Sequence, residues 1–405
     1  MRKYYSIPLL FFCFAASLGI FLRWQFISPT PGTKYTFFLH AHSHAMFLGW
    51  VFNVLYLAFV DYHLSNKDHR LFLNLFLFLQ ILVVAMMISF PLQGYGMYSI
   101  IFSTLHTLLA LIFVWMFFSR TRGMQAMSVW FARIALAFFT LSTLGPFSLG
   151  YLMSNGQGQS LWYSFSIYFY LHFQYNGFFL FGIVSLFFQL MERKEILFDT
   201  KSVRTSGKWM TLACVPAFLL STLFAKPGLL FNALGAAAAI LQIFALGLFI
   251  KELNKMKSTI RFHFKASVYN FMTWVLLFFV FKSILQLFSA HPYIAQLAYE
   301  LRPVVIAYLH LVLVGVITLF LLAWYAQMNL VSESLAVKSI ALVLIGFIGS
   351  QVCLILMPWW VNNFGVSRIS PVEWIFLFSI FPGLGSFLFF WANMAHKDDK
   401  DQPVI

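Results

Sequence analysis

The chain has few charged side chains. Only 9% of its 405 residues are Asp, Glu, Lys or Arg, and only 12 residues are acidic. A soluble domain needs such groups on its surface, and a disordered chain needs them to stay solvated. Cysteine is also scarce: Cys13, Cys214 and Cys353 lie in separate apolar stretches and form no CxxC pair. This pattern argues against a cysteine-held metal cluster or a dithiol switch.

Long apolar runs take up most of the sequence. The chain is 61% hydrophobic and 20% aromatic, and its apolar runs repeatedly exceed the roughly 18 residues that mark a membrane span. Backbone groups in hydrocarbon must pair within the chain, and barrel strands would alternate in polarity, so these runs predict helices. Twelve spans are expected, at approximately 6–27, 36–60, 71–92, 97–118, 127–152, 161–191, 208–225, 229–250, 266–289, 303–327, 337–357 and 372–394. The prediction is an all-α integral membrane protein, a twelve-helix bundle forming one polytopic domain over 1–405. No low-complexity tract or convincing internal repeat is evident.

The basic excess indicates a membrane topology. The net charge is +14, but most lysines and arginines fall in loops on the same side as the N-terminus. Cytoplasmic loops of membrane proteins carry such an excess. We therefore expect a multi-pass protein of the cell membrane with both termini in the cytoplasm, surrounded by lipid and without a nucleic-acid partner.

Histidines are concentrated inside the predicted spans. The stretch FFLHAHSHAMFLGW holds three of them within residues 37–50, and six of the 11 histidines lie in spans: His40, His42, His44, His106, His172 and His310. All occupy even-numbered spans, which would run inward from the outer face. At about 1.5 Å per residue, three of these spans place a histidine roughly 10–15 Å below that face and the sixth span places one deeper. Intramembrane ionisable residues are costly and mark functional sites, so this layer predicts ligands for a metal or cofactor.

The three histidines of the second span divide between two helix faces. His40 and His44 are one turn apart on one face, whereas His42 points in almost the opposite direction. They therefore cannot all share one metal.

One segment resembles a known family. AYLHLVLVGVITLFLLAWY, residues 307–325, is similar to the tenth helix of haem-copper oxidase subunit I, whose pattern is His-x-His-Tyr-Val-Leu-Val-Gly. His310 matches the second histidine, an axial ligand of the low-spin haem in that family. HAHSHAMFLGW is similar to the second-helix segment of members related to C-type oxidases and nitric oxide reductase, with His44 as the match and His40 as the alternative. The resemblance implies a haem b with His44 and His310 as its axial ligands.

The sequence departs from the family at the copper site. YLHFQYNGFFLFG, residues 170–182, is similar to a sixth helix whose histidine ligates copper, but His172 lies one residue farther from Gly177. The seventh span, KWMTLACVPAFLLSTLFA, lacks the family's adjacent histidine pair. Tyr308 stands where the family has the high-spin haem ligand, and it could ligate iron or simply pack. No carboxylate lies deep in a span. The resemblance therefore implies haem without a standard binuclear centre and disfavours proton pumping and oxygen or nitric oxide reduction.

Haem propionates would require cations near the outer face. Arg23, Lys34 and Arg302 are placed there, although basic flanks of spans are the ordinary explanation. Lys282 lies within the ninth span at nearly the depth of the histidines, where it could reach a propionate or extend to the interface.

Three functions follow from these patterns. The first is a haem b protein for electron transfer, haem handling or response to a diatomic gas, working with an electron-donor protein or partner subunit. The second is a twelve-helix solute transporter. The third is a haem-free copper or zinc protein using His40, His44, His106 and His172.

Overall fold

The computed structural model describes residues 1–364 and 371–401. Within these ranges the chain forms helices and short connections, without a strand. Twelve helices are long and apolar enough to cross a membrane: Arg2–Trp24, Tyr35–His63, Asn66–Gln93, Met97–Arg120, Met127–Ser154, Leu161–Arg193, Thr200–Ala225, Leu229–Lys255, Ala266–Phe288, Arg302–Gln327, Glu333–Trp360 and Pro371–His396. The predicted all-α fold with twelve spans is confirmed.

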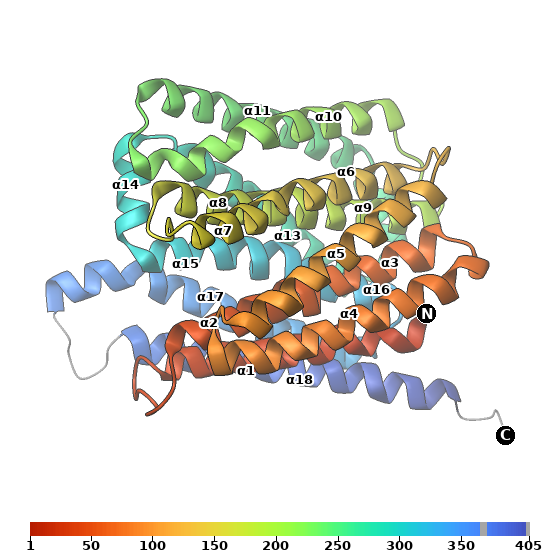
Figure 1. The fold of residues 1–405 in the computed structure, drawn as a ribbon. Coiled ribbons are helices and arrows are strands. Elements are labelled where there is room, and N and C mark those ends of the chain that lie inside the picture. The colour runs from red at the N-terminus through yellow and green to blue at the C-terminus, as the bar shows by residue number, and fades with distance from the viewer. Residues whose placement is uncertain (365–370, 402–405) are drawn as a thin grey trace. The chain divides into compact units, whose positions relative to one another are not determined.

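Most helices are regular α-helices, labelled in Figure 1. The first nine are α1 (Ser6–Trp24), α2 (Tyr35–His44), α3 (Asn53–His63), α4 (Asn66–Gln93), α5 (Met97–Arg120), α6 (Met127–Ser142), α7 (Leu144–Ser154), α8 (Leu161–His172) and α9 (Leu180–Arg193). The others are α10 (Thr200–Ala217), α11 (Leu229–Lys255), α12 (Lys257–His263), α13 (Ala266–Phe288), α14 (Pro292–Glu300), α15 (Arg302–His310), α16 (Leu319–Gln327), α17 (Glu333–Phe364) and α18 (Pro371–Asp401).

Five segments have other helical geometry. Two are 3₁₀-helices, η1 (Arg2–Tyr5) and η4 (Phe218–Ala225). Three are π-helices, η2 (Ala45–Phe52), η3 (Phe173–Phe179) and η5 (Leu311–Thr318). Each π-helix joins two α-helices within a single span, so the second, sixth and tenth spans each change geometry partway along their length.

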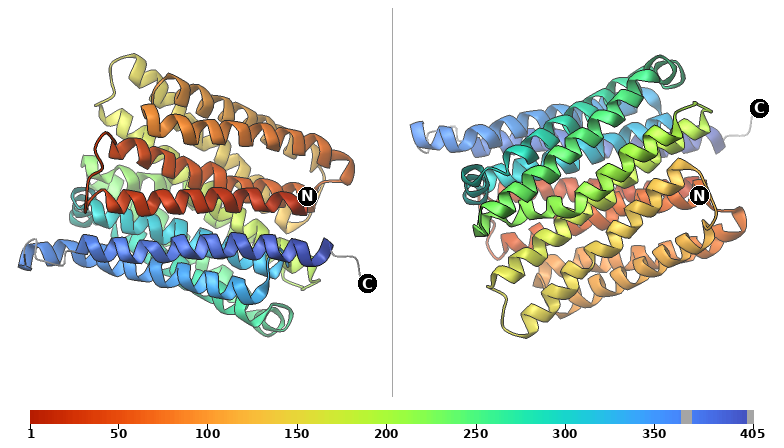
Figure 2. Two further views of the ribbon diagram at one scale, coloured as in Figure 1. Left: turned by 90° about the horizontal axis from the view of Figure 1, so that it is seen from below. Right: turned by 90° about the horizontal axis from the view of Figure 1, so that it is seen from above.

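The chain divides into two compact units. Unit 1 comprises residues 1–122 and 318–405. In it α1 packs against α18, α18 lies beside α17, and α4 packs against both α2 and α5, as Figures 1 and 2 show. Aromatic side chains fill its interior. Trp50 donates a hydrogen bond to Thr318 Oγ1 over 3.2 Å, and Tyr325 donates one to the carbonyl of Tyr5 over 3.0 Å.

Unit 1 also contains a buried amide pair. Asn53 Nδ2 donates to Gln80 Oε1 over 2.6 Å, and Gln80 Nε2 donates back to Asn53 Oδ1 over 3.1 Å. Such a pair joins α3 to α4 where lipid offers the amides no other partner.

Unit 2 comprises residues 123–317. Its helices α10 and α11 pack side by side, α6 packs against α9 and η3, and α11 also contacts α13. Glu192 accepts hydrogen bonds from the backbone N–H and the hydroxyl of Ser128, near the first turn of α6. A carboxylate at that position satisfies donors that the helix leaves unpaired.

Candidate functional site

Each of the three π-helices begins immediately after a histidine. η2 follows His44, η3 follows His172 and η5 follows His310. π-Helical segments are uncommon and frequently occur at functional sites, because they shift side chains out of the α-helical register. The second, sixth and tenth spans thus share one local structure, in which an α-helix ends at a histidine and a π-helix follows.

A glycine occurs five residues after the histidine in all three segments. The sequences are HAMFLG, HFQYNG and HLVLVG, ending at Gly49, Gly177 and Gly315. A Cβ at Gly49 would lie 2.8 Å from Phe11 Cβ, and one at Gly177 would lie 2.6 Å from Phe138 Cβ. Both distances are too short for a contact between non-bonded carbon atoms, so neither position has room for a side chain. The motif recurs at intervals of four spans, on the second, sixth and tenth spans.

His44 and His42 face different neighbours within unit 1, as their spacing predicts. The ring of His44 lies 4.3 Å from that of Phe90 on α4, and His40 lies 4.4 Å from Tyr95. His42 faces α1, where its Nδ1 donates to the carbonyl of Ala15 over 2.8 Å.

The hydrogen bond of His44 determines its tautomer. Nδ1 lies 2.8 Å from the carbonyl oxygen of His40, one turn back on the same helix. A carbonyl can only accept, so Nδ1 carries the proton and Nε2 is the nitrogen with a lone pair. The side chain is half-buried, between the fully buried Ala41 and Ala45.

His310 repeats this arrangement in unit 2. Its Nδ1 donates to the carbonyl of Ile306 over 2.8 Å, again one turn back on its own helix. The same argument makes Nε2 the nitrogen with the lone pair. In metal sites, a ligating imidazole almost always donates its other N–H to a carbonyl, carboxylate or water. His44 and His310 therefore share a hydrogen bond of the kind that ligating histidines make in metal sites.

His172 has a different arrangement. Its Nε2 donates to the carbonyl of Cys214 on α10 over 2.9 Å, and its Nδ1 accepts from Asn176 Nδ2 over 3.2 Å. The side chain is 1% exposed. Both ring nitrogens are thus engaged, and the imidazole connects α8 to α10. As placed, His172 has no lone pair to offer copper.

His106 on α5 is 1% exposed and packs edge-on against Phe52. Its Nε2 has no hydrogen-bond partner in the described part of the chain. His44 interacts with it electrostatically within unit 1.

The four histidine-bearing helices also agree in where their histidines lie. His44, His106 and His310 come eight or nine residues after the first residue of their helices, and His172 comes eleven after. The predicted offsets along the helices are therefore confirmed. Their common depth in a bilayer stays a prediction.

The predicted cations lie in dissimilar surroundings. Arg23, at the end of α1, is half-buried and interacts electrostatically with Tyr35 and His42. Arg302 is exposed at the first residue of α15. Lys282 is 3% exposed, and its Nζ donates to Gln286 Oε1 over 2.6 Å. The glutamine one turn along the same helix holds the ammonium inside unit 2.

Tyr308, two residues before His310, is half-buried and interacts electrostatically with Tyr175 of η3 in the same unit. Its role as an iron ligand stays a prediction.

Among residues 1–364 and 371–401, no three His, Cys, Asp or Glu side chains form a group that could hold a metal ion. The haem-free copper or zinc site thus receives no support. A haem needs only two protein ligands, so this finding does not bear on haem.

The tautomers and the π-helices could not be foreseen from single residues. A usable signal was nevertheless present, because the spacing of five residues between histidine and glycine recurs on three spans.

Comparison with solved structures finds the same fold elsewhere. A haem-copper terminal oxidase dimer, solved by cryo-electron microscopy, matches with a TM-score of 0.67 and 12% sequence identity, over 98% of this chain and 82% of that chain. No protein family and no curated protein matches the sequence. The chain therefore has the fold of a haem-copper oxidase and is a multi-pass membrane protein, and the resemblance inferred from its tenth span is confirmed at the level of the fold.

Proposed function

We propose that the protein binds haem b, with His44 and His310 as the two axial ligands, and transfers electrons through it. The observation that supports this most strongly is the matching hydrogen bond in the two residues. In each, Nδ1 donates over 2.8 Å to the carbonyl one turn back, which leaves Nε2 as the ligating nitrogen. The proposal rests on what each histidine does inside its own unit.

Competing histidines fit the role less well. His42 also keeps a lone pair on Nε2, but it lies on the opposite face of the helix from His44 and is bonded to α1, whereas His172 uses both nitrogens. His40 contributes its carbonyl to His44, so it supports the ligand's orientation. Such support is typical of the groups that surround metal ligands.

The coordination would determine the chemistry. His44 and His310 would hold the haem through two imidazoles, and a haem held by two histidines would supply electron transfer and not substrate activation. The chain's own contribution is to hold each imidazole in one tautomer and orientation. A separate electron-donor protein or partner subunit would supply the electrons.

An absorption spectrum of the purified protein tests this proposal. We expect a b-type spectrum of a six-coordinate, low-spin haem. His44→Ala and His310→Ala should each abolish it, because each removes one of the two iron ligands. His42→Ala and His172→Ala are the matched controls and should retain it.

Two results would contradict the proposal. One is an unchanged spectrum in His310→Ala, and the other is folded, haem-free protein that takes up a solute when reconstituted in vesicles. The second result would favour the transporter.

We also propose that both termini lie in the cytoplasm, since the basic residues of Lys194–Arg204 and Lys251–Lys265 would then occupy inner loops. Fusion of a reporter that is active only in the cytoplasm to the C-terminus should give an active reporter. Activity of an exported reporter at the same position would reverse the assignment.

A further inference from the structure

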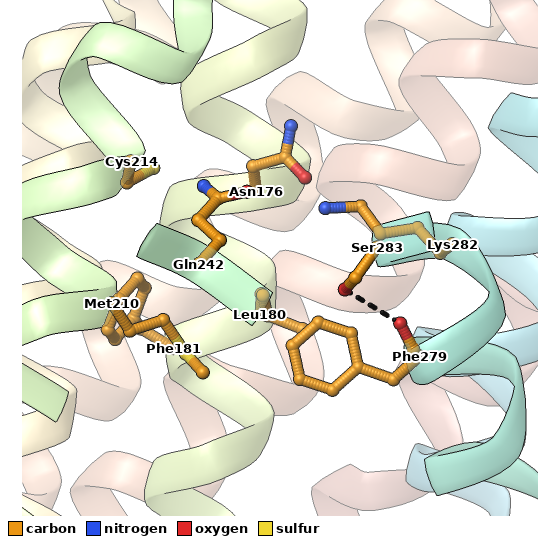
Figure 3. A pocket seen from close by; sticks show the side chains of 9 residues that line it. All are labelled: Asn176, Leu180, Phe181, Met210, Cys214, Gln242, Phe279, Lys282 and Ser283. Atoms are coloured by element: carbon orange, nitrogen blue, oxygen red, sulfur yellow. Dashed lines mark hydrogen bonds between the residues drawn. The ribbon is translucent and has the colours of Figure 1, made fainter. Parts of the chain in front are cut away.

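A small cavity lies between α10, α11 and α13 of unit 2, next to η3. Figure 3 shows its lining, which includes the polar side chains of Asn176, Gln242, Lys282 and Ser283 and the thiol of Cys214. Its volume is about 10 Å³. A cavity needs on the order of 10–15 Å³ by this measure to hold one water molecule, and water is found where polar groups surround the space.

The hydrogen bonds around the cavity have a fixed direction. The carbonyl of Cys214 can only accept, so Nε2 of His172 must be the protonated nitrogen and Nδ1 must accept. The amide of Asn176 must then present its NH₂ group to Nδ1. This leaves Asn176 Oδ1 without a hydrogen-bond partner in the described residues, although the residue is only 4% exposed. A buried acceptor without a hydrogen-bond partner is energetically unfavourable.

Lys282 brings unused donors to the same space. Figure 3 shows its amine directed to the side of the cavity where the oxygen of Asn176 lies. One of its donors bonds Gln286 Oε1, whereas an ammonium has three. Its electrostatic neighbours are the thiol of Cys214 on α10 and the imidazole of His172 on α8. Ser283, the next residue of α13, already donates its hydroxyl to the carbonyl of Phe279.

We propose that this cavity binds one water molecule between Lys282 and Asn176. The ligand must accept a hydrogen bond from the ammonium and donate one to Asn176 Oδ1, and only a small protic molecule does both in this volume. The Lys282 ammonium would then be a buried cation whose protons exchange with bound water. It depends on neither haem nor the proposed axial ligands.

Water-edited solid-state NMR on the protein in lipid nanodiscs, with ¹⁵Nζ-labelled lysine, tests the site. The Lys282 signal is identified by its loss in Lys282→Met or, if that variant does not fold, in Lys282→Arg. Although Lys282 is buried, its signal should build up from water about as fast as the signals of exposed lysines. Asn176→Leu removes the acceptor while keeping the number and branching of the side-chain heavy atoms, and it should slow the build-up several-fold. Asn232→Leu, a matched substitution elsewhere in unit 2, should leave it unchanged.

Three outcomes would overturn the proposal. Slow build-up at Lys282 in the native protein would mean that the ammonium is dry, and this measurement needs no variant. Equal build-up in Asn176→Leu would mean that Asn176 does not hold the water. If added chloride or nitrite slows the build-up in the native protein only, the site holds an inorganic anion instead.

Discussion

His44 in unit 1 and His172 in unit 2 share the same spacing to a following glycine but have opposite hydrogen bonding. Each precedes a π-helix and a glycine five residues later. His44 bonds its own helix through Nδ1, whereas His172 bonds a neighbouring helix through Nε2 and accepts from Asn176 through Nδ1. Only the first arrangement leaves a nitrogen for a metal.

The difference shows what determines the role of an intramembrane histidine. When the N–H group is satisfied inside the same helix, the ring is oriented and one nitrogen keeps its lone pair. When a neighbouring helix takes the N–H group and an amide occupies the other nitrogen, the same residue type connects two helices and stabilises the bundle. His172, which the sequence suggests as a copper ligand, has both ring nitrogens in hydrogen bonds and connects α8 to α10.

The largest effect on stability is expected from removing this connection. His172→Phe would remove the hydrogen bond to the Cys214 carbonyl and leave the NH₂ group of Asn176 unpaired in a buried environment, which costs about 2–4 kcal/mol in all. We expect a marked fall in the midpoint of thermal unfolding in detergent with an unchanged absorption spectrum per folded protein. Loss of the spectrum with stability intact would erase the distinction between the two histidines.

The glycines test whether the shared π-geometry depends on close packing. Gly49→Ala and Gly177→Ala should each cost about 1–3 kcal/mol, since the new methyl group would overlap Phe11 or Phe138. Gly247→Ala is the control: it lies within α11 with no atom near the added carbon, and it should be neutral or stabilising by up to about 1 kcal/mol. Unfolding midpoints of the three variants measure these effects, and equal midpoints would mean that close packing does not require glycine.

The number of spans and the fold class were predictable from the sequence, because hydropathy over some twenty residues depends little on tertiary detail. The opposite orientations of His42 and His44 were also predictable, since they follow from helical periodicity alone. The tautomers were not. They depend on which carbonyl lies near each ring: Ile306 O lies on the same helix as His310, but Cys214 O is 42 residues away from His172. Nor could the burial of Lys282 be foreseen, because it depends on residues of α10 and α11, such as Cys214 and Gln242, that lie around the same cavity.

The smallest effect concerns the histidine that faces away from His44. His42→Leu removes one hydrogen bond, to the carbonyl of Ala15, a group that also belongs to the backbone of α1. The loss should be about 1 kcal/mol or less, because the carbonyl keeps access to its helical partner. The absorption spectrum of His42→Leu should be identical to that of the native protein. His44→Leu makes the same change in size two residues along the same helix and should abolish the spectrum. Comparing the two variants separates the effect of iron ligation from the effect of packing within a single turn of helix. If His42→Leu lost the spectrum and His44→Leu kept it, the iron ligand would be His42, on the helix face that packs against α1.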